Sequence, residues 1–322
     1  MKLFSTLLVT AFSGLGQVNA FAPTSVTNQK NVHYVAESRA AFGVLNPLVV
    51  PKVTLPRRST AIFMGWGPDP IWSSARVSAI SPACPSESCV NLVLEVSAET
   101  AEGYTVPGQY VQMKIAGDDD AQPIFLAIAS PPQIADEGEP TFMEFLIKKT
   151  ENNGWITSAN EGDTVDVSQV LGNGFPMDEN FEGFKYDFPT QNVLLFATGS
   201  GIAPIRAVIE SGQLSVGAPG EGGRTARLYY GIQTTADMPY AERFGIWERS
   251  GVQVVPVISQ PENCKYEWEG RTGYVQNALE EDGVPIPRNS GALLCGVKGM
   301  TESVKDILSQ AGVFEGRLLT NF

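Results

Sequence analysis

The stretch that decides the fold is Val193-Leu-Leu-Phe-Ala-Thr-Gly-Ser-Gly-Ile-Ala-Pro-Ile-Arg-Ala-Val-Ile-Glu210. Its first five residues are apolar without alternation, which predicts a central strand covered on both faces. A glycine-rich turn follows at 198–201, and Pro204 suits the first turn of a helix, where a backbone N–H has no helical partner. Apolar residues then recur at helical spacing over 205–209, so we expect a strand, a tight turn and a helix.

The turn between this strand and this helix has the properties of an anion-binding site. Backbone N–H groups point outward at a helix N-terminus, the helix dipole favours negative charge, and glycines let a phosphate approach the backbone. A Gly-x-Gly turn also occurs without any ligand, and the third glycine of the usual dinucleotide fingerprint is absent here. The turn alone therefore leaves both interpretations open.

Thr198-Gly-Ser-Gly-Ile-Ala-Pro204 resembles the pyridine-nucleotide motif of the ferredoxin–NADP reductase superfamily. Four later segments resemble further elements of that family's nicotinamide domain, in the same order. They are Tyr229-Tyr-Gly231, Ser259-Gln-Pro261, Gly270-Arg-Thr-Gly-Tyr-Val275 and Leu294-Cys-Gly296. The resemblance implies FAD and NAD(P)H as cofactors, and it covers nearly all of residues 75–322.

Residues 191–322 alternate β-type and helical patterns after the central element. The apolar runs are 226–230, 252–257 and 292–294, and the helical stretches lie near 238–250, 274–282 and 300–311. Such alternation predicts a doubly wound parallel sheet with its ligand at the carboxyl ends of the strands. We expect this half to be the NAD(P)-binding α/β domain.

Residues 66–180 show short apolar or alternating runs separated by turns, which predicts a small antiparallel β-barrel of the flavin-binding type. The runs are 90–96, 110–115, 124–129, 141–149 and 164–167. Four segments resemble, in order, elements of the superfamily's FAD-binding barrel. They are Pro107-Gly-Gln-Tyr-Val111, 142–149, Gly162-Asp163 and Leu171-Gly-Asn-Gly-Phe-Pro176. A linker is expected at 178–190.

The flavin motif is where the sequence departs from the family pattern. Members typically carry Arg-x-Tyr-Ser, in which the arginine pairs with the FAD pyrophosphate, the tyrosine stacks on the ring and the serine bonds the flavin N5. Ile124, Leu126 and Ala127 replace those three residues here, so a charge-assisted phosphate contact is lost. Leu126 can still pack against the ring, and the Ala127 N–H can replace the serine hydroxyl.

The resemblance assigns cofactor contacts residue by residue. The flavin contacts are Leu126, Ala127, Ile128 and Ala129, together with Gly154, Trp155, Ile156 and Thr157, where the family's short helix holds the pyrophosphate. The dinucleotide contacts are Thr198, Gly199, Ser200, Gly201, Ile202, Ala203, Pro204, Gly231, Gln233, Ser259, Gly296 and Met300. In the family the cysteine at 295 lies beside the nicotinamide C4, and a C-terminal aromatic such as Phe322 covers the flavin. A buried structural Cys295, an ordinary loop around Trp155 and a frayed tail are the alternatives.

The first sixty residues have the composition of targeting sequence. A short charged start, an apolar run over 3–15 and Ala20 fit a signal peptide at 1–20, which is too short to span a membrane. Phe21-Ala-Pro23 resembles the Ala-Phe-Ala-Pro junction of bipartite presequences in algae with secondary plastids. Residues 21–60 are basic and hydroxyl-rich with a single acid, Glu37, which is typical of a transit peptide. We expect the plastid stroma, with plain secretion as the alternative.

Without this leader the chain is strongly acidic. The leader holds six of the 22 basic residues and one of the 35 acids, which leaves 16 basic and 34 acidic residues and a net charge of −18. That charge disfavours nucleic acid and anionic membranes as partners. The single histidine, His33, belongs to the leader, so the mature chain has no histidine for a catalytic triad or a metal site.

The four cysteines are Cys84, Cys89, Cys264 and Cys295, and they show no zinc or iron–sulfur spacing. No metal site is therefore expected. Cys84 and Cys89 flank a four-residue loop that a disulfide would close, but a reducing compartment such as the stroma favours free thiols.

The combined interpretation is an FAD oxidoreductase that moves a hydride from NAD(P)H to the flavin N5 and on to an unidentified acceptor. The acidic surface argues against ferredoxin and for a small molecule or a neutral or basic protein. Gln260 stands where the family often has an arginine for the 2′-phosphate, which slightly favours NADH. Two alternatives remain: a flavin-free nucleotide-binding scaffold of the same fold, and an electron-transfer subunit like that of dihydroorotate dehydrogenase, whose cluster-binding cysteines are missing here.

Overall fold

The computed structural model describes residues 69–133, 139–183, 185–217 and 223–321. The expected signal and transit peptides at 1–20 and 21–60 lie outside the described residues, and so does Phe322. All the described residues belong to one unit, so the contacts between its two halves can be followed directly.

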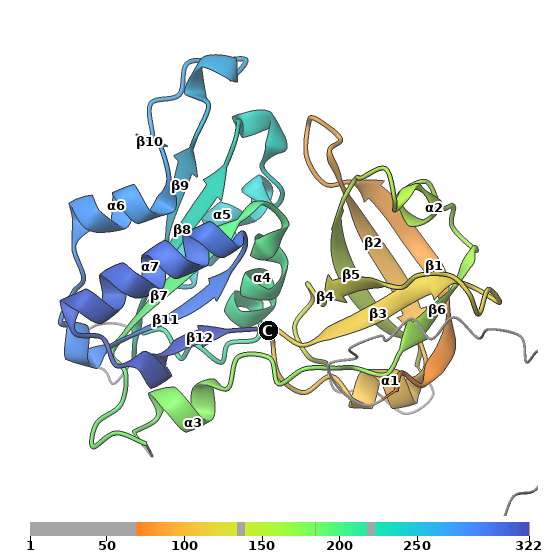
Figure 1. Ribbon diagram of the computed structural model, residues 1–322, viewed down its shortest axis with the longest axis horizontal. Helices are drawn as coiled ribbons and strands as arrows, with labels where there is room; N and C mark the ends of the chain where they lie inside the picture. Colours follow the sequence, from red (N-terminus) through yellow and green to blue (C-terminus); the bar gives the residue numbers. More distant parts are fainter. Residues whose placement is uncertain (1–68, 134–138, 184, 218–222, 322) are drawn as a thin grey trace, which may run out of the picture. The chain divides into compact units, whose positions relative to one another are not determined.

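Six antiparallel strands form the first half (Figure 1). They are β1 Trp72–Pro82, β2 Cys89–Val96, β3 Tyr110–Ile115, β4 Ile124–Ala127, β5 Thr141–Lys148 and β6 Thr164–Ser168. Their order is β4-β3-β6-β1-β2-β5, and a bridge between Ile128 and Phe145 joins the two edge strands. The sheet is therefore a nearly closed antiparallel barrel, which confirms the predicted fold class of this half.

The strand β1 and the short helices of this half were not among the predicted elements. Within β1 only Ala75 and Val77 are buried, so the segment lacks the alternation by which the other strands were found. The helices are α1 Ala98–Glu102, α2 Gly154–Thr157 and α3 Met177–Phe181. The last one lies inside the expected linker and is anchored by Phe181, whose side chain is fully buried.

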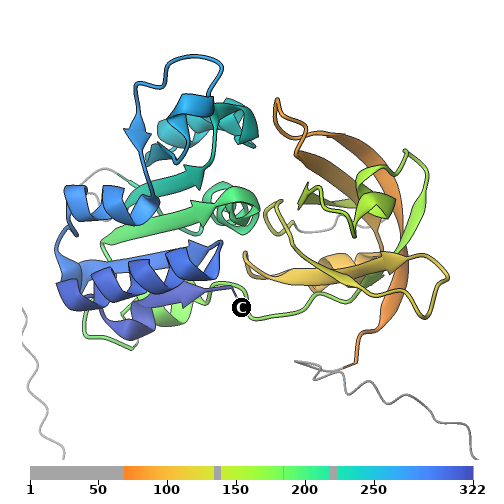
Figure 2. The ribbon, with the colours of Figure 1, turned by 45° about the horizontal axis from the view of Figure 1, so that its top comes forward.

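Six parallel strands form the second half. They are β7 Asn192–Thr198, β8 Thr225–Ile232, β9 Val252–Ile258, β10 Arg271–Thr272, β11 Ser290–Cys295 and β12 Leu318–Thr320. Their order is β10-β9-β8-β7-β11-β12, and every neighbouring pair is parallel. Figure 2 shows this sheet with the blue helix α7, Lys298–Ala311, lying across one face.

Both faces of the parallel sheet are covered by helices, as the unbroken apolar run of β7 predicted. Val193, Leu195 and Ala197 share a core with α4 Ile202–Glu210 and α5 Phe244–Arg249. Leu194 and Phe196 face the opposite core, with α6 Val275–Asp282 and α7. This half is the predicted doubly wound α/β domain.

The strand order reverses next to β7, which fixes where a ligand can bind. From β7 the chain proceeds to β8 and β9 on one side, and later to β11 and β12 on the other. At such a switch point the connections leave in opposite directions and open a crevice at the carboxyl ends of the strands. The ends of β7 and β11, at Thr198 and Cys295, border that crevice.

Candidate dinucleotide site

The turn after β7 is held against the end of β11 by two glycines. A Cβ atom on Gly201 would lie 2.3 Å from the carbonyl oxygen of Cys295, and one on Gly296 would lie 2.0 Å from Thr198 Oγ1. Gly296 also has φ +155°, and the next residue, Val297, donates its N–H to Thr198 Oγ1 at 3.0 Å. The two strand ends therefore meet only because both positions lack a side chain.

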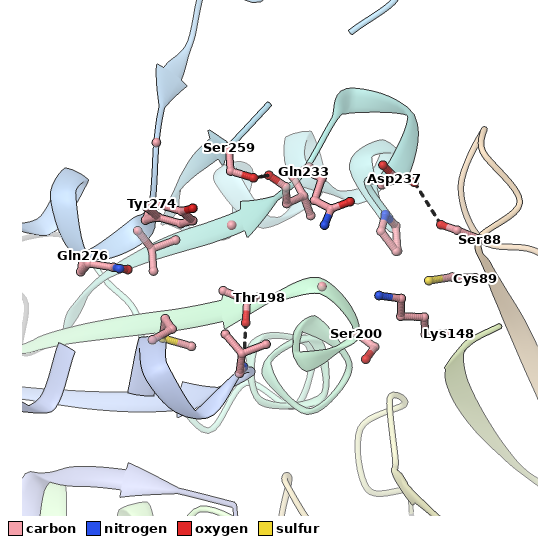
Figure 3. A pocket seen from close by; sticks show the side chains of 18 residues that line it. Ser88, Cys89, Lys148, Thr198, Ser200, Gln233, Asp237, Ser259, Tyr274 and Gln276 are labelled. Carbon is pink, nitrogen blue, oxygen red and sulfur yellow. Dashed lines mark hydrogen bonds between the residues drawn. The ribbon is translucent and has the colours of Figure 1, made fainter. Parts of the chain in front are cut away.

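A cavity of about 530 Å³ opens at this turn (Figure 3). Its walls come from the turn itself, the ends of β8 and β9, the start of α6, the start of α7, and the barrel. The lining residues are Ser88, Cys89, Lys148, Thr198, Gly199, Ser200, Gly231, Ile232, Gln233, Asp237, Pro239, Ser259, Gly273, Tyr274, Val275, Gln276, Val297 and Met300. This volume is within the range of small-molecule and cofactor sites.

Two charged side chains line the cavity, and both lie near the barrel. The Lys148 ammonium projects into the space that Ser200 faces, and the described part of the chain shows no ion pair for it (Figure 3). Burial raises the pKa of Asp237, but hydrogen bonds from the hydroxyls of Ser86, Thr234 and Ser88 outweigh it, so the pKa is lowered. The hydroxyl donors and the Lys148 charge therefore keep Asp237 ionised, while the Lys148 ammonium, which is not within ion-pair distance of it, remains available to an anionic ligand.

The other end of the cavity carries neutral polar groups and one aromatic ring. Gln233, Ser259 and Gln276 supply amides and a hydroxyl, and the Tyr274 ring is 61% exposed. An exposed aromatic face beside amide donors suits a flat heterocycle such as a purine. Arg271, the cation closest in sequence, is occupied by Glu281 and Asp282.

Arg206 ties the helix of the nucleotide turn to the barrel. Its side chain is 2% exposed, and its Nη1 lies 2.6 Å from Glu144 Oε2 on β5. Its Nε lies 3.0 Å from Glu210 on α4, and its guanidinium lies 4.8 Å from the centre of the Tyr240 ring. Burial lowers the pKa of Arg206, but the contacts with Glu144 and Glu210 outweigh it and raise the pKa, so the charge is permanent.

The cavity brings together seven residues that the sequence predicted. They are Thr198, Gly199, Ser200, Gly231, Gln233, Ser259 and Met300. Gly201 and Gly296 lie directly behind the wall as packing positions. Ile202, Ala203 and Pro204 are buried in the first turn of α4 and do not line the cavity, so their contact with a dinucleotide stays a prediction.

Cys295 ends β11 behind the same wall and is 9% exposed. Burial raises its pKa to about 12, while a hydrogen bond with Asn321 acts in the opposite direction. Cys295 therefore stays a neutral thiol at physiological pH and is suited to a packing contact rather than to proton transfer. Leu318, Leu319 and Asn321 are buried and β12 pairs with β11, so this part of the C-terminus is not frayed.

Sequence reasoning missed the wall that the barrel contributes. Ser88, Cys89 and Lys148 lie fifty residues or more from any predicted dinucleotide contact. The available signal was positional, because Lys148 ends β5, inside the segment 142–149 that resembles an element of the family's barrel. Tyr274 belongs to the segment 270–275 that resembles the family, but the sequence did not predict that it contacts the dinucleotide.

The barrel offers a second set of groups for a cofactor, along β4. This strand pairs with β3 on one side only, and contact with β5 begins at Ile128. Ile128 donates its N–H towards β3, to Gln109, so by alternation the Ala127 N–H points towards the open edge. Leu126 packs against the barrel core, as do Ile124 and Trp155, whereas Phe125 is 54% exposed on the outer face.

The remaining predicted flavin residues have mixed positions. Ile128, Ala129 and Ile156 are fully buried, and Thr157 is 8% exposed. A Cβ added to Gly154, at the start of α2, would meet nothing within 4 Å. An unpaired strand edge and an open backbone at α2 fit a flat ring with a phosphate tail, although the cation of the family motif is absent at Ile124.

Comparison with known proteins agrees with this arrangement. Residues 195–306 match the family model of the oxidoreductase NAD-binding domain. The chain is 35% identical over 258 residues to fruit protein pKIWI502 of Actinidia deliciosa, covering 77% of this chain and 76% of that protein. The chain belongs to the ferredoxin–NADP reductase superfamily. It is an NAD(P)H-dependent flavin oxidoreductase, with FAD and NAD(P)H as its cofactors.

Other members of the superfamily place this reductase in context. Sulfhydrogenase 1 subunit gamma of Pyrococcus furiosus is 29% identical, covering 66% of this chain and 67% of that subunit. The solved ferredoxin NADP+ reductase of Neisseria gonorrhoeae with bound FAD and NADP has the same fold, with a TM-score of 0.61 at 15% identity, covering 77% and 97% of the two chains. A cytochrome P450 reductase of Amycolatopsis gives the same TM-score at 21% identity, covering 79% and 70%.

Proposed function

We propose that this reductase oxidises NADH in preference to NADPH and delivers the electrons to a small molecule or to a neutral or basic protein. The proposal rests on the charges of the residues that line the cavity. Among the described residues that line it, the only cation is Lys148, at the end nearest the glycine turn, while the end with Tyr274 is lined by neutral Gln233, Ser259 and Gln276. A 2′-phosphate gains most from a guanidinium partner, which this end does not supply.

Each part of the dinucleotide has a counterpart in the cavity. Tyr274 supplies a face for the adenine ring, and the open N-terminus of α4 with Lys148 holds the pyrophosphate. Val297 and Met300 then border the nicotinamide, with Cys295 behind them. FAD supplies the two-electron chemistry when bound, by accepting the hydride. The residues of the chain orient the nicotinamide and exclude water, and no side chain needs to transfer a proton.

Steady-state kinetics with each coenzyme test the nucleotide preference. We expect kcat/KM for NADH to exceed that for NADPH by about tenfold or more, which corresponds to one lost charge-assisted contact. Gln233→Arg is expected to raise kcat/KM for NADPH, with Gln233→Met as the uncharged control of similar length. Equal use of both coenzymes by the unaltered protein would contradict the proposal.

The choice of acceptor is supported by the charge of the chain. A net charge of −18 outside the leader opposes close approach of an acidic ferredoxin. Turnover with ferredoxin, measured over a series of ionic strengths, should be slow and should not fall as salt increases. Efficient turnover that salt weakens would show attraction between opposite charges and would overturn this assignment.

We infer also that residues 1–60 direct the reductase to a secondary plastid. The apolar run over 3–15, the Phe21-Ala-Pro23 segment and the basic region after it support this. Residues 1–60 fused to a fluorescent protein should carry it into the plastid stroma in an alga of that kind. Secretion of the fusion would contradict the inference. Among the residues that the structure describes, no helix has the length and apolar content to cross a bilayer.

A further inference from the structure

Two thiols at the tip of the β1–β2 hairpin lie beside the dinucleotide cavity. Cys84 follows β1 and Cys89 begins β2, with four residues between them. Both are free thiols, and they are 7% and 6% exposed. The N–H of Ala83 donates to the Cys89 carbonyl at 2.9 Å, so the end of the hairpin places Cys89 opposite Ala83, the residue before Cys84.

The two thiols interact and differ in acidity. Burial first, and then the charge of the neighbouring Cys84 and a hydrogen bond with it, raise the pKa of Cys89 to about 11. Burial also acts to raise the pKa of Cys84, but hydrogen bonds from Ser86, Ser88 and the backbone outweigh it, so its pKa is lowered. Cys84 is therefore the thiol that ionises first, with a protonated partner beside it.

The loop between the cysteines connects them to the wall of the cavity. The hydroxyls of Ser86 and Ser88 lie 2.7 and 3.1 Å from Asp237 Oδ1, and 3.3 and 3.4 Å from the Cys84 sulfur. The Ser86 N–H also donates to the Ala236 carbonyl at 2.9 Å. Ser88, Cys89 and Asp237 all line the cavity (Figure 3), so a change at the thiol pair reaches the binding space within one contact.

We propose that Cys84 and Cys89 form a reversible dithiol–disulfide site that small hydroperoxides oxidise, and that the disulfide weakens dinucleotide binding in the adjoining cavity. The Cys84 thiolate attacks one oxygen of hydrogen peroxide and the O–O bond breaks. Hydroxide departs, and Cys84 becomes a sulfenic acid. The Cys89 sulfur then loses its proton and attacks the Cys84 sulfur. The S–S bond forms, the S–O bond breaks and water leaves. Two electrons pass from the dithiol to the peroxide, and a small dithiol reductant returns them.

The disulfide changes the cavity through the same contacts. In the disulfide, Cys84 has neither the proton nor the charge with which it hydrogen-bonds to the Ser86 and Ser88 hydroxyls, so these hydroxyls reorient and their contacts with Asp237 change. The Cys89 sulfur turns towards Cys84 and away from the cavity that it lines. Both changes disturb the barrel wall beside Lys148, which is why binding weakens rather than strengthens.

Mass spectrometry and calorimetry on the full-length protein test the proposal. After treatment with an equimolar amount of hydrogen peroxide and alkylation of the remaining thiols, peptide mapping should show Cys84 linked to Cys89 and the protein lighter by two hydrogen atoms. The dissociation constant for NADH should rise about tenfold, a typical coupling between two sites, and return after dithiothreitol treatment. Cys264→Ser, which alters a thiol away from the cavity, should respond like the unaltered protein.

Single variants separate the two parts of the proposal. Cys89→Ser should stop at a Cys84 sulfenic acid, which a dimedone probe detects, and its affinity for NADH should not respond reversibly through a disulfide. Oxidation of Cys84 in the unaltered protein without a link to Cys89 would overturn the dithiol site. A disulfide that leaves the NADH affinity unchanged would overturn its effect on the cavity. That effect rests on the proposed NADH site, so reduced protein that binds no NADH would refute the function and leave the peptide map to decide the thiol site.

Discussion

The glycine turn of the α/β domain and the β4 edge of the barrel show two ways of keeping a cofactor site. At the turn the family motif is intact, because a side chain at Gly201 or Gly296 would collide with the neighbouring strand end. At β4 the side chains of the family motif have been replaced at Ile124, Leu126 and Ala127, while the unpaired backbone edge remains. A site that requires glycines tolerates no substitution at those positions. A site whose hydrogen bonds come from backbone N–H groups tolerates many side-chain substitutions, because every residue except proline supplies that donor.

The largest effect is expected from breaking the glycine turn. Gly201→Ala places a methyl group 2.3 Å from the Cys295 carbonyl oxygen, and overpacking of this kind costs about 1–3 kcal/mol. Because the strain separates the ends of β7 and β11, NADH binding should weaken by up to about a hundredfold. Isothermal calorimetry and thermal melting measure both effects. Gly299→Ala on α7, where a Cβ meets nothing within 4 Å, should leave NADH binding unchanged and should not lower the melting temperature.

The next effect concerns the link between the turn and the barrel. Arg206→Met removes the ion pairs with Glu144 and Glu210 and leaves Glu144 without a cation in a partly buried place, whereas Glu210 keeps Arg243 and the Trp247 N–H. We expect the free energy of unfolding to fall by about 2–3 kcal/mol, somewhat less than for a fully buried pair. Urea unfolding measures it, with Arg249→Met at an exposed position on α5 as the control. Equal stability of the two variants would show that α4 and β5 are held together by apolar packing alone.

A smaller effect separates packing from hydride transfer at Cys295. Cys295→Ala should slow flavin reduction by NADH about tenfold and leave the FAD content unchanged, because an interaction made mainly in the transition state appears in the rate. Stopped-flow absorbance measures the rate, and the flavin spectrum measures the content. Since the Cys295 pKa is raised to about 12, the ratio of the two rates should be constant between pH 6 and 9. An unchanged rate would assign Cys295 a structural role only.

An arginine at position 124, where the family motif has one, would test how much FAD affinity the barrel has lost. FAD should be bound non-covalently and more weakly than in relatives that carry the arginine. Ile124→Arg should then tighten FAD binding, by about tenfold at most, since a charged hydrogen bond is worth about 1.5–3 kcal/mol and some apolar packing is lost. Recovery of FAD fluorescence on dilution measures this, with Ile124→Gln as the uncharged control. Protein that never takes up FAD would contradict the cofactor assignment.

The smallest effect is the pH dependence of the contact at Asp237. Its pKa is lowered in the folded protein, so ionised Asp237 stabilises the fold above its unfolded pKa of about 3.9, and this contribution is lost as the pH falls through the folded value. Asp237→Asn should therefore melt at a lower temperature at pH 7, by a degree or so, about what a few tenths of a kcal/mol produces. The difference should disappear once the pH has fallen below the folded-state pKa of Asp237. A difference that grows on acidification would contradict this account.

The sequence by itself determined the two-domain architecture and the position of the glycine turn. Buried strands such as β7 carry continuous apolar residues, and the barrel strands alternate, because each pattern reports which faces of a strand are covered. The limits of the predicted strands and helices agree with the structure to within a few residues, except near 238–250, where α5 covers only Phe244–Arg249. The strands β1, β10 and β12 were not predicted from the sequence. Most residues of β1 are partly or fully exposed, and β10 and β12 have only two and three residues, so none of them shows a hydrophobic periodicity.

Only the tertiary structure decided which distant residues complete the site. Closure of the barrel and its packing against the α/β domain bring Lys148 to the glycine turn and Ser86 to within 2.7 Å of Asp237, 151 residues away. No local pattern encodes such a contact, because it depends on how the ends of two different sheets lie against each other. The same holds for Arg206. Nothing in the sequence around it distinguishes it from an ordinary helical arginine, yet it is buried between two carboxylates from different elements. Local sequence specifies the backbone at each site, and the packing of the whole chain specifies the charges and thiols that face it.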